Sequence, residues 1–303
     1  MTDTHLIFIV NEHSRKGKKF TSDIHDLLNN YKQVTYDIHI TEYRKHAVEI
    51  ADSLSRSIGS NSLLVAVGGD GTLNEVVQGV VQSKADIPIA YIPTGSGNDF
   101  AQSRNLSKKI SESIDHILSI SEPTVLDVLL GQMKDGPIVA VNSTGYGIDG
   151  TVISKMEKNR NKETVGRLSY LMNVLSGYFS QKPFPVTIKT PEKDYFFEES
   201  MLVLCANQKY FAGGIPIHPL ADATDGMIDL LVAEKVTFFE LLSILIKIMT
   251  KESHLSHKKL HAYRATSCQV SVGKPQYGQR DGELIDPSNT TLDVTTIKLP
   301  FWL

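Results

Sequence analysis

The first 120 residues alternate between two patterns, and this alternation constrains the fold more than any other feature of the chain. Short runs rich in β-branched and aromatic residues have the composition of strands; they are 6–10, 34–40, 62–67 and 87–93. Between them, apolar residues recur every three or four positions, as in helices with one buried face. Strands that alternate with helices pair in parallel through right-handed crossovers. The pattern therefore predicts an α/β domain with a mostly parallel sheet.

The rest of the chain follows a different pattern. Beyond residue 124, several β-rich runs follow one another, interrupted by helical patterns only around 151–180 and 237–250. A succession of strands is typical of an antiparallel domain. Pro123 stands at the change of pattern and ends the helical run before it. We therefore expect an α/β domain over 1–123 and a separate β-rich domain over 124–291.

Composition excludes several classes of protein. A chain of 303 residues with 41% hydrophobic and 21% charged residues is expected to be globular, and a net charge of −3 argues against a general nucleic-acid binder. Cys205 and Cys268 each lie in an apolar run, which favours free thiols in a reducing cytoplasm over a disulfide framework. The longest apolar run, 238–249, is shorter than the ~20 residues of a membrane span. No membrane-crossing segment is expected.

A turn of small residues, Gly68–Gly71, follows the third strand-like run and opens a helical one. Ligands of α/β sheets bind at the carboxyl ends of the strands, where a helix start offers N–H groups and a positive dipole to an anion. The glycines let the backbone approach that anion, and Thr72 is placed to cap the helix. Because Asp70 would repel a phosphate unless a cation lay between them, the turn predicts a nucleotide bound with Mg²⁺. The alternative is an ordinary turn with an acid near a helix start.

A second turn of this kind lies within 92–101, at the end of the next strand-like run. Gly95 and Gly97 flank Ser96, and Asn98 and Asp99 open the following helix. Two neighbouring parallel strands place such turns at one sheet edge, so the two sets of backbone amides and carboxylates would converge on one ligand. The alternative is a second capped turn, with Asp99 serving only the helix dipole. Two coincident turns favour a shared function.

At these residues the chain resembles the diacylglycerol kinase catalytic domain family, which includes bacterial lipid kinases and sphingosine kinases. "GGDGTLNEV" and "PTGSGNDFA" are similar to the two nucleotide motifs of that family at the customary separation. The first motif alone is shared with NAD kinases and phosphofructokinases; the second favours the lipid branch. The resemblance continues through "NSTGYGIDG", "GRLSY", "ATDGMIDL" and "RDGE" and so covers nearly the whole chain. It departs at Glu12, where the family usually has proline.

The resemblance implies a NAD kinase/diacylglycerol kinase-like α/β domain followed by an antiparallel β-sandwich-like domain, with the last segment, about 292–303, returning to the first domain. It also implies that ATP is the phosphoryl donor and that Asp70 lies near Mg²⁺. The nucleotide-binding residues carried over from the family are Thr41, Gly68, Gly69, Asp70, Gly71, Thr72, Leu73, Asn74 and Ser96. Serine at 96 keeps the hydroxyl of the threonine that the family more often has.

A hydroxyl acceptor needs a base near the γ-phosphate, and kinases commonly use a carboxylate. "QRDGELI" places Asp281 and Glu283 on either side of Gly282, between strand-like runs. Spacing alone favours an exposed hairpin. The family resemblance implies instead that one of these acids is the proton acceptor. Glu283 is the favoured base, with Asp281 organising metal and water, and the opposite assignment stays open.

A third acidic turn lies within 219–230. Asp222, Asp225 and Asp229 surround Gly226, and acids at this spacing either gather a hard cation or form an acidic surface turn. The resemblance to bacterial lipid kinases implies a structural Mg²⁺ here. Its expected ligands are Asp222, Asp225 and the carbonyl oxygen of Met227.

Two basic segments lie beside apolar sequence. Residues 155–182 contain six Lys or Arg against two Glu, and residues 247–264 contain five against one. Such segments are attracted to an anionic membrane by about 1 kcal/mol per basic residue near the surface. The alternative is a solvated helix face over a core stripe.

Together these observations predict an ATP- and Mg²⁺-dependent lipid kinase that phosphorylates diacylglycerol to phosphatidic acid in phospholipid biosynthesis. Its expected partner is a lipid at the membrane surface, from a cytoplasmic location with peripheral membrane association, with no nucleic acid; a homodimer is compatible with the sequence. One alternative is a kinase of another lipid alcohol, such as a sphingoid base or undecaprenol. The other is a nucleotide-sensing regulatory protein without turnover.

Overall fold

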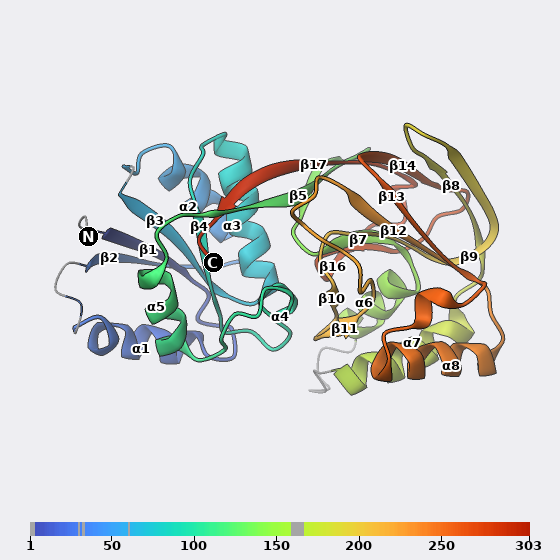
Figure 1. The fold of residues 1–303 in the computed structure, drawn as a ribbon, viewed down its shortest axis with the longest axis horizontal. Helices are drawn as coiled ribbons and strands as arrows, with labels where there is room; N and C mark the ends of the chain where they lie inside the picture. The colour runs from blue at the N-terminus through green and yellow to red at the C-terminus, as the bar shows by residue number, and fades with distance from the viewer. Residues whose placement is uncertain (1–3, 30, 32–33, 60, 159–166) are drawn as a thin grey trace. The chain divides into compact units, whose positions relative to one another are not determined.

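The computed structural model describes residues 4–29, 31, 34–59, 61–158 and 167–303. The chain divides into two compact units, an α/β unit 1 of Met1–Leu126 with Lys298–Leu303 and a β-rich unit 2 of Asp127–Ile297. Figure 1 shows the strands and helices of each. None of the helices within the described ranges is long and apolar enough to cross a membrane.

Parallel strands form the centre of unit 1, as the alternating pattern predicts. The strands lie in the order β2, β1, β3, β4. Their bounds are β1 Thr4–Val10, β2 Val34–Ile40, β3 Ser62–Gly68 and β4 Ile89–Pro93. Because side chains alternate along a strand, Leu6, Phe8 and Val10 of β1 share one face of the sheet and join one core cluster.

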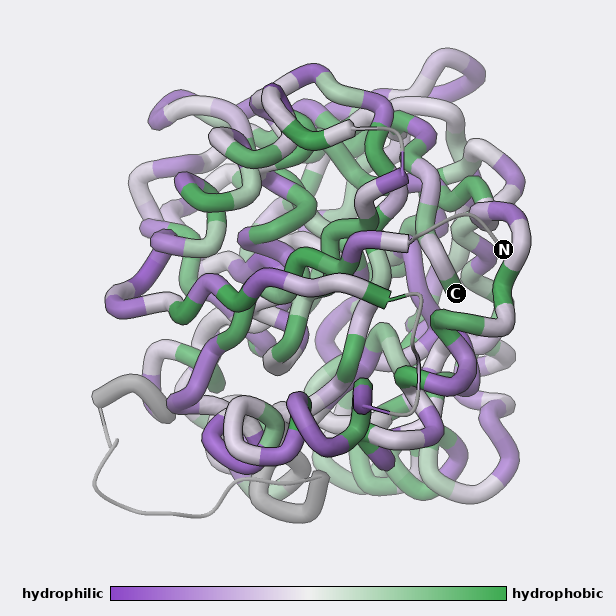
Figure 2. Tube along the Cα trace, turned by 90° about the vertical axis from the view of Figure 1, so that its left-hand side faces the viewer, coloured by the Kyte–Doolittle hydropathy of each residue, from purple (hydrophilic) through white to green (hydrophobic). Residues whose placement is uncertain are grey.

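Helices cover both faces of this sheet (Figure 1). They are α1 Gly17–Leu28, α2 His46–Ser55, α3 Asp70–Ser83, α4 Asp99–Ser103 and α5 Ile110–Ser119. Phe20 of α1 and Ile114 of α5 pack in the cluster of Phe8. Helices α2 and α3 approach closely at Gly79, where an added Cβ would lie 2.6 Å from the Cβ of Ala51. In Figure 2 hydrophobic residues gather inside and hydrophilic ones on the outer loops.

The end of the chain belongs to unit 1. Phe301, the last residue of β17 (Thr291–Phe301), pairs in parallel with Ile89 at the start of β4. The indole N–H of Trp302 donates to the carbonyl oxygen of Ile117 over 2.8 Å. Phe301 is fully buried and packs against Phe100 with ring centroids 5.4 Å apart. Of the segment expected to return, about 292–303, Lys298–Leu303 group with unit 1, whereas residues 292–297 group with unit 2.

Antiparallel ladders dominate unit 2. The long strand β9 pairs with β7, β8 and β12, and β14 pairs with β8 and β17. The strand bounds are β5 Thr124–Met133, β6 Gly136–Ala140, β7 Ser143–Gly147, β8 Phe184–Lys189, β9 Asp194–Ala206, β10 Tyr210–Phe211, β11 Ile215–Pro216, β12 Ile228–Glu234, β13 Leu260–Ala265, β14 Ser267–Val272, β15 Gly278–Arg280 and β16 Glu283–Ile285. Cys205 and Cys268 are free thiols in this core, with sulfurs 3.8 Å apart.

Three α-helices of the described part of unit 2 lie outside these ladders. They are α6 Ile148–Lys158, α7 Arg167–Ser180 and α8 Phe238–Thr250, and a 3-10 turn spans His254–Ser256. Thr237 and Glu240 form a capping box at the start of α8, in which the hydroxyl and carboxylate accept each other's backbone N–H. Val174 of α7 and Leu241 and Ile244 of α8 share one buried cluster.

Candidate functional site

The two glycine turns of unit 1 meet at one edge of the sheet. Because β3 and β4 are parallel neighbours, the carbonyl oxygen of Gly68 accepts the N–H groups of Thr94 (2.8 Å) and Gly95 (3.2 Å). An added Cβ on Gly95 would lie only 2.5 Å from the Cα of Gly69. The two turns therefore meet at this edge, and glycine at 95 is required by their close approach; a ligand shared between them stays a prediction.

The carboxylate of Asp70 joins the two turns. Its oxygens accept the backbone N–H groups of Asp99 and Phe100, each over 3.0 Å, at the start of the short helix α4. Asn98 precedes this helix in the left-handed region, and its side chain bonds the N–H and carbonyl of Gly95. Asp70 therefore has two roles: it caps the start of α4 from the neighbouring turn, which fixes the second turn, and it places a negative charge at this edge.

Tyr91 lies beneath both turns. Its hydroxyl is within hydrogen-bond distance of the Gly68 carbonyl (3.2 Å) and the Asn98 side chain (3.3 Å). Burial raises the pKa of Tyr91, and the charges of Asp70 and Asp99 raise it further. The phenol therefore stays protonated and able to donate to these backbone and side-chain oxygens.

The loop after β1 completes this edge; it is the stretch in which the resemblance departs from the family at Glu12. The Asn11 amide donates to the Thr72 hydroxyl over 3.2 Å, and the Ser14 and Thr94 hydroxyls lie 2.8 Å apart. The expected capping role of Thr72 is wrong, because the N-cap residue of α3 is Gly69, which has no side chain to accept a helix N–H. Asn11, in the "NEHSRKGK" stretch, was the one available signal that this loop belongs to the site.

The other predicted nucleotide residues differ in accessibility. Gly71 and Ser96 are exposed, whereas Leu73 and Asn74 are buried within α3. Leu73 can face a ligand only through its backbone, since its side chain is in the core. Thr41 follows β2 at the same carboxyl edge, and its N–H donates to the Val10 carbonyl over 2.9 Å. Glycine backbone and the start of α3 thus lie at one sheet edge, the arrangement in which α/β proteins bind anions, whereas the first N–H groups of α4 are taken by Asp70.

In unit 2, Asp281 and Gly282 form the two-residue turn between β15 and β16, and both have positive φ. The predicted hairpin is therefore present, but its acid does not simply point to solvent. The Asp281 carboxylate accepts three backbone N–H groups, from Val141 (2.6 Å), Asn142 (2.8 Å) and Ser143 (2.9 Å). This carboxylate clamps the hairpin to the start of β7.

Glu283 has a different environment from Asp281. Its carboxylate forms an ion pair with Arg280 at 3.0 Å, and 19% of the side chain is exposed. Gln279, one residue before Arg280, accepts the N–H of Gly282 over 3.0 Å. The hairpin thus holds the Glu283 carboxylate in an ion pair with Arg280 and leaves part of the side chain open to solvent.

The glycines of β7 serve strand packing. Added Cβ atoms on Gly145 and Gly147 would lie 2.1 Å and 2.3 Å from the carbonyl oxygens of Val203 and Met201 in the antiparallel neighbour β9. Although "GYGIDG" fits a dinucleotide fingerprint by spacing, an antiparallel partner excludes the parallel βαβ unit that the fingerprint needs. The turn instead delivers Asp149 to the first turn of α6, where it is 1% exposed.

An apolar cavity of about 100 Å³ lies in unit 2 beneath α7 and α8. Side chains such as Val174, Leu231 and Ile244 make up most of its wall, and Asp149 also lines it. Burial raises the pKa of Asp149 to about 6. Hydrogen bonds from the N–H of Gly150 and the side chain of Gln279 lower this pKa but only partly offset the effect of burial. The cavity therefore offers an apolar space next to one buried carboxyl group.

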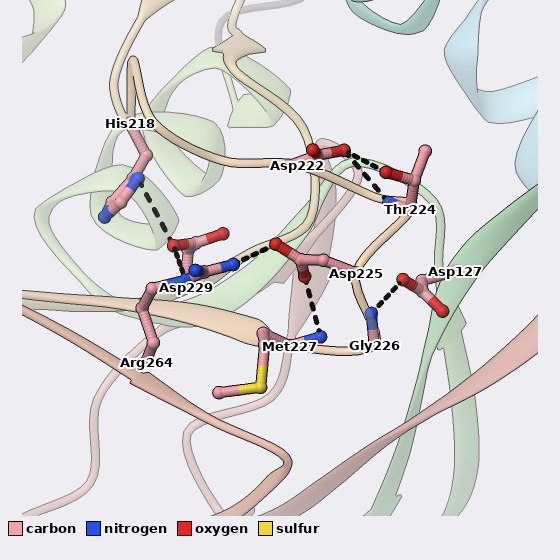
Figure 3. Close-up of polar contacts among 9 residues, drawn as sticks. All are labelled: Asp127, His218, Asp222, Thr224, Asp225, Gly226, Met227, Asp229 and Arg264. Carbon is pink, nitrogen blue, oxygen red and sulfur yellow. Dashed lines mark hydrogen bonds and ion pairs between the residues drawn. The ribbon is translucent and has the colours of Figure 1, made fainter.

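The predicted metal ligands lie on the loop before β12, each with its own hydrogen bonds. Figure 3 shows the carboxylates of Asp222 and Asp225 turned toward different partners. Asp222 accepts the N–H (3.0 Å) and hydroxyl (2.7 Å) of Thr224. Asp225 accepts the N–H of Met227 (2.9 Å) and is ion-paired with Arg264.

Arg264 also contacts Asp229, its direct partner in the antiparallel ladder of β12 and β13. The guanidinium Nε lies 3.2 Å from Asp229 Oδ1, so a cationic side chain stands between Asp225 and Asp229 (Figure 3). Within the described residues no group of three or more His, Cys, Asp or Glu side chains is arranged to hold a metal ion. As placed here, Asp222, Asp225 and Met227 do not form a ligand set, and a structural Mg²⁺ at this turn stays a prediction.

The fold defines a class of protein: an α/β unit with two glycine turns at one sheet edge, followed by a β sandwich-like unit. Comparison with family models gives the same division. Residues 5–129 match the diacylglycerol kinase catalytic domain, and residues 142–300 match a domain described as "YegS C-terminal NAD kinase beta sandwich-like". The chain belongs to the diacylglycerol kinase catalytic domain family.

Individual relatives are similar over most of their length. A "Putative lipid kinase" of Staphylococcus carnosus (strain TM300) is 30% identical over 238 residues, which cover 74% of this chain and 75% of the relative. A diacylglycerol kinase of Staphylococcus saprophyticus is 29% identical over 230 residues, covering 76% and 73%. A crystal structure of a diacylglycerol kinase from Bacillus anthracis str. Sterne has the same fold, with a TM-score of 0.67, 18% identity and coverage of 99% and 96%.

Proposed function

We propose that the protein transfers the γ-phosphoryl group of ATP to the hydroxyl of diacylglycerol, giving phosphatidic acid and ADP. The observation that carries the choice of a lipid acceptor is the apolar cavity of unit 2, whose wall is built from side chains such as Val174, Leu231 and Ile244. A sugar or nucleotide acceptor would need a polar pocket, whereas an aliphatic chain needs this kind of wall.

The chemistry is divided between the two units. In unit 1, the Gly68–Gly71 turn and the start of α3 bind the phosphates through backbone N–H groups, and Asp70 holds the second turn beside them. In unit 2, Glu283 takes the proton of the acceptor hydroxyl. The oxygen of that hydroxyl bonds to the γ-phosphorus as the bond between this phosphorus and the β-phosphate oxygen breaks, and ADP leaves. Asp281 positions Glu283 through its three N–H bonds and does not itself take the proton.

The nucleotide site fits phosphates bound with Mg²⁺. The turn is open at Gly71, where an added Cβ would meet nothing within 4 Å, and the Asp70 carboxylate supplies a hard oxygen ligand next to it. Mg²⁺ bound with ATP would neutralise charge on the transferring phosphoryl group. The chain's own residues bind and orient the phosphates.

Radiolabelled ATP with a panel of lipid acceptors in mixed micelles tests the proposal. We expect label in phosphatidic acid when diacylglycerol is present. Label only in a sphingoid base or in undecaprenol would reassign the acceptor within the same reaction class. ATP binding without label in any lipid would favour a nucleotide-sensing regulatory protein.

Because the two acids have separate roles, substitutions at Glu283 and Asp281 are expected to have different effects. Glu283→Gln is expected to lower single-turnover phosphoryl transfer by about 10²–10⁴-fold with little change in melting temperature, because it removes a general base. Asp281→Asn is expected to lower the free energy of unfolding by roughly 3 kcal/mol, because an amide replaces an acceptor of three N–H groups. Wild-type transfer by Glu283→Gln would exclude Glu283 as the base.

A further inference from the structure

Helix α8 is apolar on its outer as well as its inner face. Its sequence, FFELLSILIKIMT, has only Glu240, Ser243, Lys247 and Thr250 as polar residues. Leu241, Ile244 and Ile248 are buried against the cluster that lines the cavity. On the opposite side, Phe239 is 81% and Ile246 is 61% exposed. A helix that is hydrophobic all round normally has an apolar neighbour on every side.

Helix α7 extends the exposed face. Phe179 is 72% exposed, and its ring lies 5.5 Å from that of Phe238, which in turn lies 6.0 Å from Phe239. Met172, two turns earlier on α7, is also exposed. We call this the α7–α8 patch: Met172, Phe179, Phe238, Phe239 and Ile246. It holds five of the ten large hydrophobic side chains that are exposed among the described residues.

Lysines flank the two helices in the sequence, and Glu234 and Glu252 lie just outside the ranges that contain them. Residues 172–182 and 235–251 contain Lys182, Lys235, Lys247 and Lys251 against a single acid, Glu240. That acid is the N3 residue of the capping box, so its carboxylate accepts the backbone N–H of Thr237 at the start of α8. Lys155 of α6 adds a further ammonium at the end of α7, where it donates to Ser180 Oγ over 2.7 Å. Of the predicted basic segment 155–182, residues 159–166 lie outside the described residues.

We propose that the α7–α8 patch is the surface through which this protein docks on an anionic lipid bilayer. An aromatic apolar face with lysines at its edge fits the boundary between acyl chains and anionic headgroups. The inner sides of the same two helices line the apolar cavity, so docking here places only α7 and α8 between the bilayer and the cavity. This inference rests on the proposed function for its meaning, but it can be tested without turnover.

The test is cosedimentation with vesicles of equal parts phosphatidylcholine and phosphatidylglycerol, without ATP. Each change in the double variant Phe179→Ser, Phe239→Ser is expected to weaken partition about tenfold, because a phenylalanine side chain gains at least that factor on leaving water. Phe196→Ser is the matched control, since Phe196 is a 66% exposed phenylalanine on β9 of the same unit. It is expected to bind like the wild type. Wild-type binding by the double variant, or equal loss in the control, would overturn the proposal.

A charge variant separates the apolar and electrostatic contributions. Lys235→Gln with Lys251→Gln is expected to weaken binding to the anionic vesicles, with a loss that shrinks as salt is raised. On pure phosphatidylcholine vesicles, this variant should bind like the wild type. Equal loss on both kinds of vesicle would contradict the assignment of the lysines to anionic headgroups.

Two further measurements separate membrane docking by the α7–α8 patch from a role in catalysis and from a role in dimer formation. On a short-chain diacylglycerol dispersed in solution, Phe239→Ser should keep wild-type turnover, whereas on long-chain diacylglycerol in vesicles it should lose activity in step with binding. If the wild type binds vesicles through the patch but phosphorylates no lipid, the kinase proposal fails and the docking surface stands. A dimer in sedimentation velocity that Phe239→Ser dissociates, with vesicle binding unchanged, would instead assign the patch to a second copy of the chain.

Discussion

A buried carboxyl group beside an apolar cavity gives Asp149 an unusual proton affinity. Its pKa is raised from 3.8 to about 6, chiefly by burial. A group with a raised pKa stabilises the fold fully below its unfolded value, and this contribution is lost as pH rises through the folded value. Near neutral pH the folded protein therefore carries the cost of an ionised, buried Asp149.

The Asp149→Asn variant measures this cost. Relative to the variant, the wild type is expected to lose roughly 2–3 kcal/mol of unfolding free energy between pH ~4 and ~7, because one pKa unit is about 1.4 kcal/mol. Urea unfolding of both proteins across this range checks the prediction. A difference that stayed constant with pH would show that Asp149 is not buried as described.

The comparison with a variant is needed because His218 acts in the opposite direction. Burial lowers the pKa of His218 from 6.5 to about 4, with the His254 charge second. This depressed pKa makes the fold lose stability as pH falls from 6.5 toward 4, the window in which Asp149 adds stability. The pH profile of the wild type alone therefore combines two contributions of opposite sign.

At the scale of elements, the loop before β12 is held by the β13 strand beside it. Arg264 of β13 pairs with Asp225 of the loop and with Asp229, which is 1% exposed. Burial raises the pKa of Asp229 to about 6, and the charge of Arg264 opposes this. The guanidinium therefore does for these carboxylates what a bound cation would do.

Arg264→Gln is expected to lower the unfolding free energy by roughly 1–3 kcal/mol, since it leaves a buried carboxylate without its cation while the arginine itself is half exposed. Lys259→Gln is the control, because Lys259 precedes β13 and its partner Glu234 is 22% exposed, against 1% for Asp229. That change is expected to cost less than about 1 kcal/mol. The measurement is thermal melting with Mg²⁺ and with chelator.

The chelator arm separates the guanidinium from a metal. A melting temperature of the wild type that is the same with and without Mg²⁺ would count against a structural Mg²⁺ at this turn. A fall on chelation of the wild type would support the predicted Mg²⁺ at Asp222, Asp225 and Met227. Recovery of Arg264→Gln by added Mg²⁺ would show that the same loop can accept either cation.

At the scale of the whole molecule, unit 1 contains both ends of the chain. Phe301 is separated from Ile89 by most of the sequence, yet it extends the sheet beside β4 and is fully buried. Phe301→Ala is expected to lower the unfolding free energy by roughly 3–5 kcal/mol through the cavity it leaves. The exposed Phe196 provides the comparison, with an expected cost within about 0.5 kcal/mol. Equal losses in urea unfolding would contradict the packing of the last strand on unit 1.

Much of the site at the first sheet edge could be predicted from local sequence. Glycines after a strand and before a helix have few other uses, so the turns at Gly68–Gly71 and Gly95–Gly97 and their position on β3 and β4 followed from the pattern. The role of Asp70 could not be predicted from local sequence. Whether it faces a ligand or caps α4 depends on where Asp99 and Phe100 lie, which no local pattern specifies.

By itself, the sequence determined the order of strands and helices, the parallel sheet and the two glycine turns, because periodicity and glycine act over a few neighbouring residues. Only the tertiary structure decided which carboxylate does what. Asp281 became a clamp because Val141–Ser143 present their N–H groups to it, and Asp225 met Arg264 because β12 and β13 pair in one register. These partners are far apart along the chain, and long-range packing alone selects them.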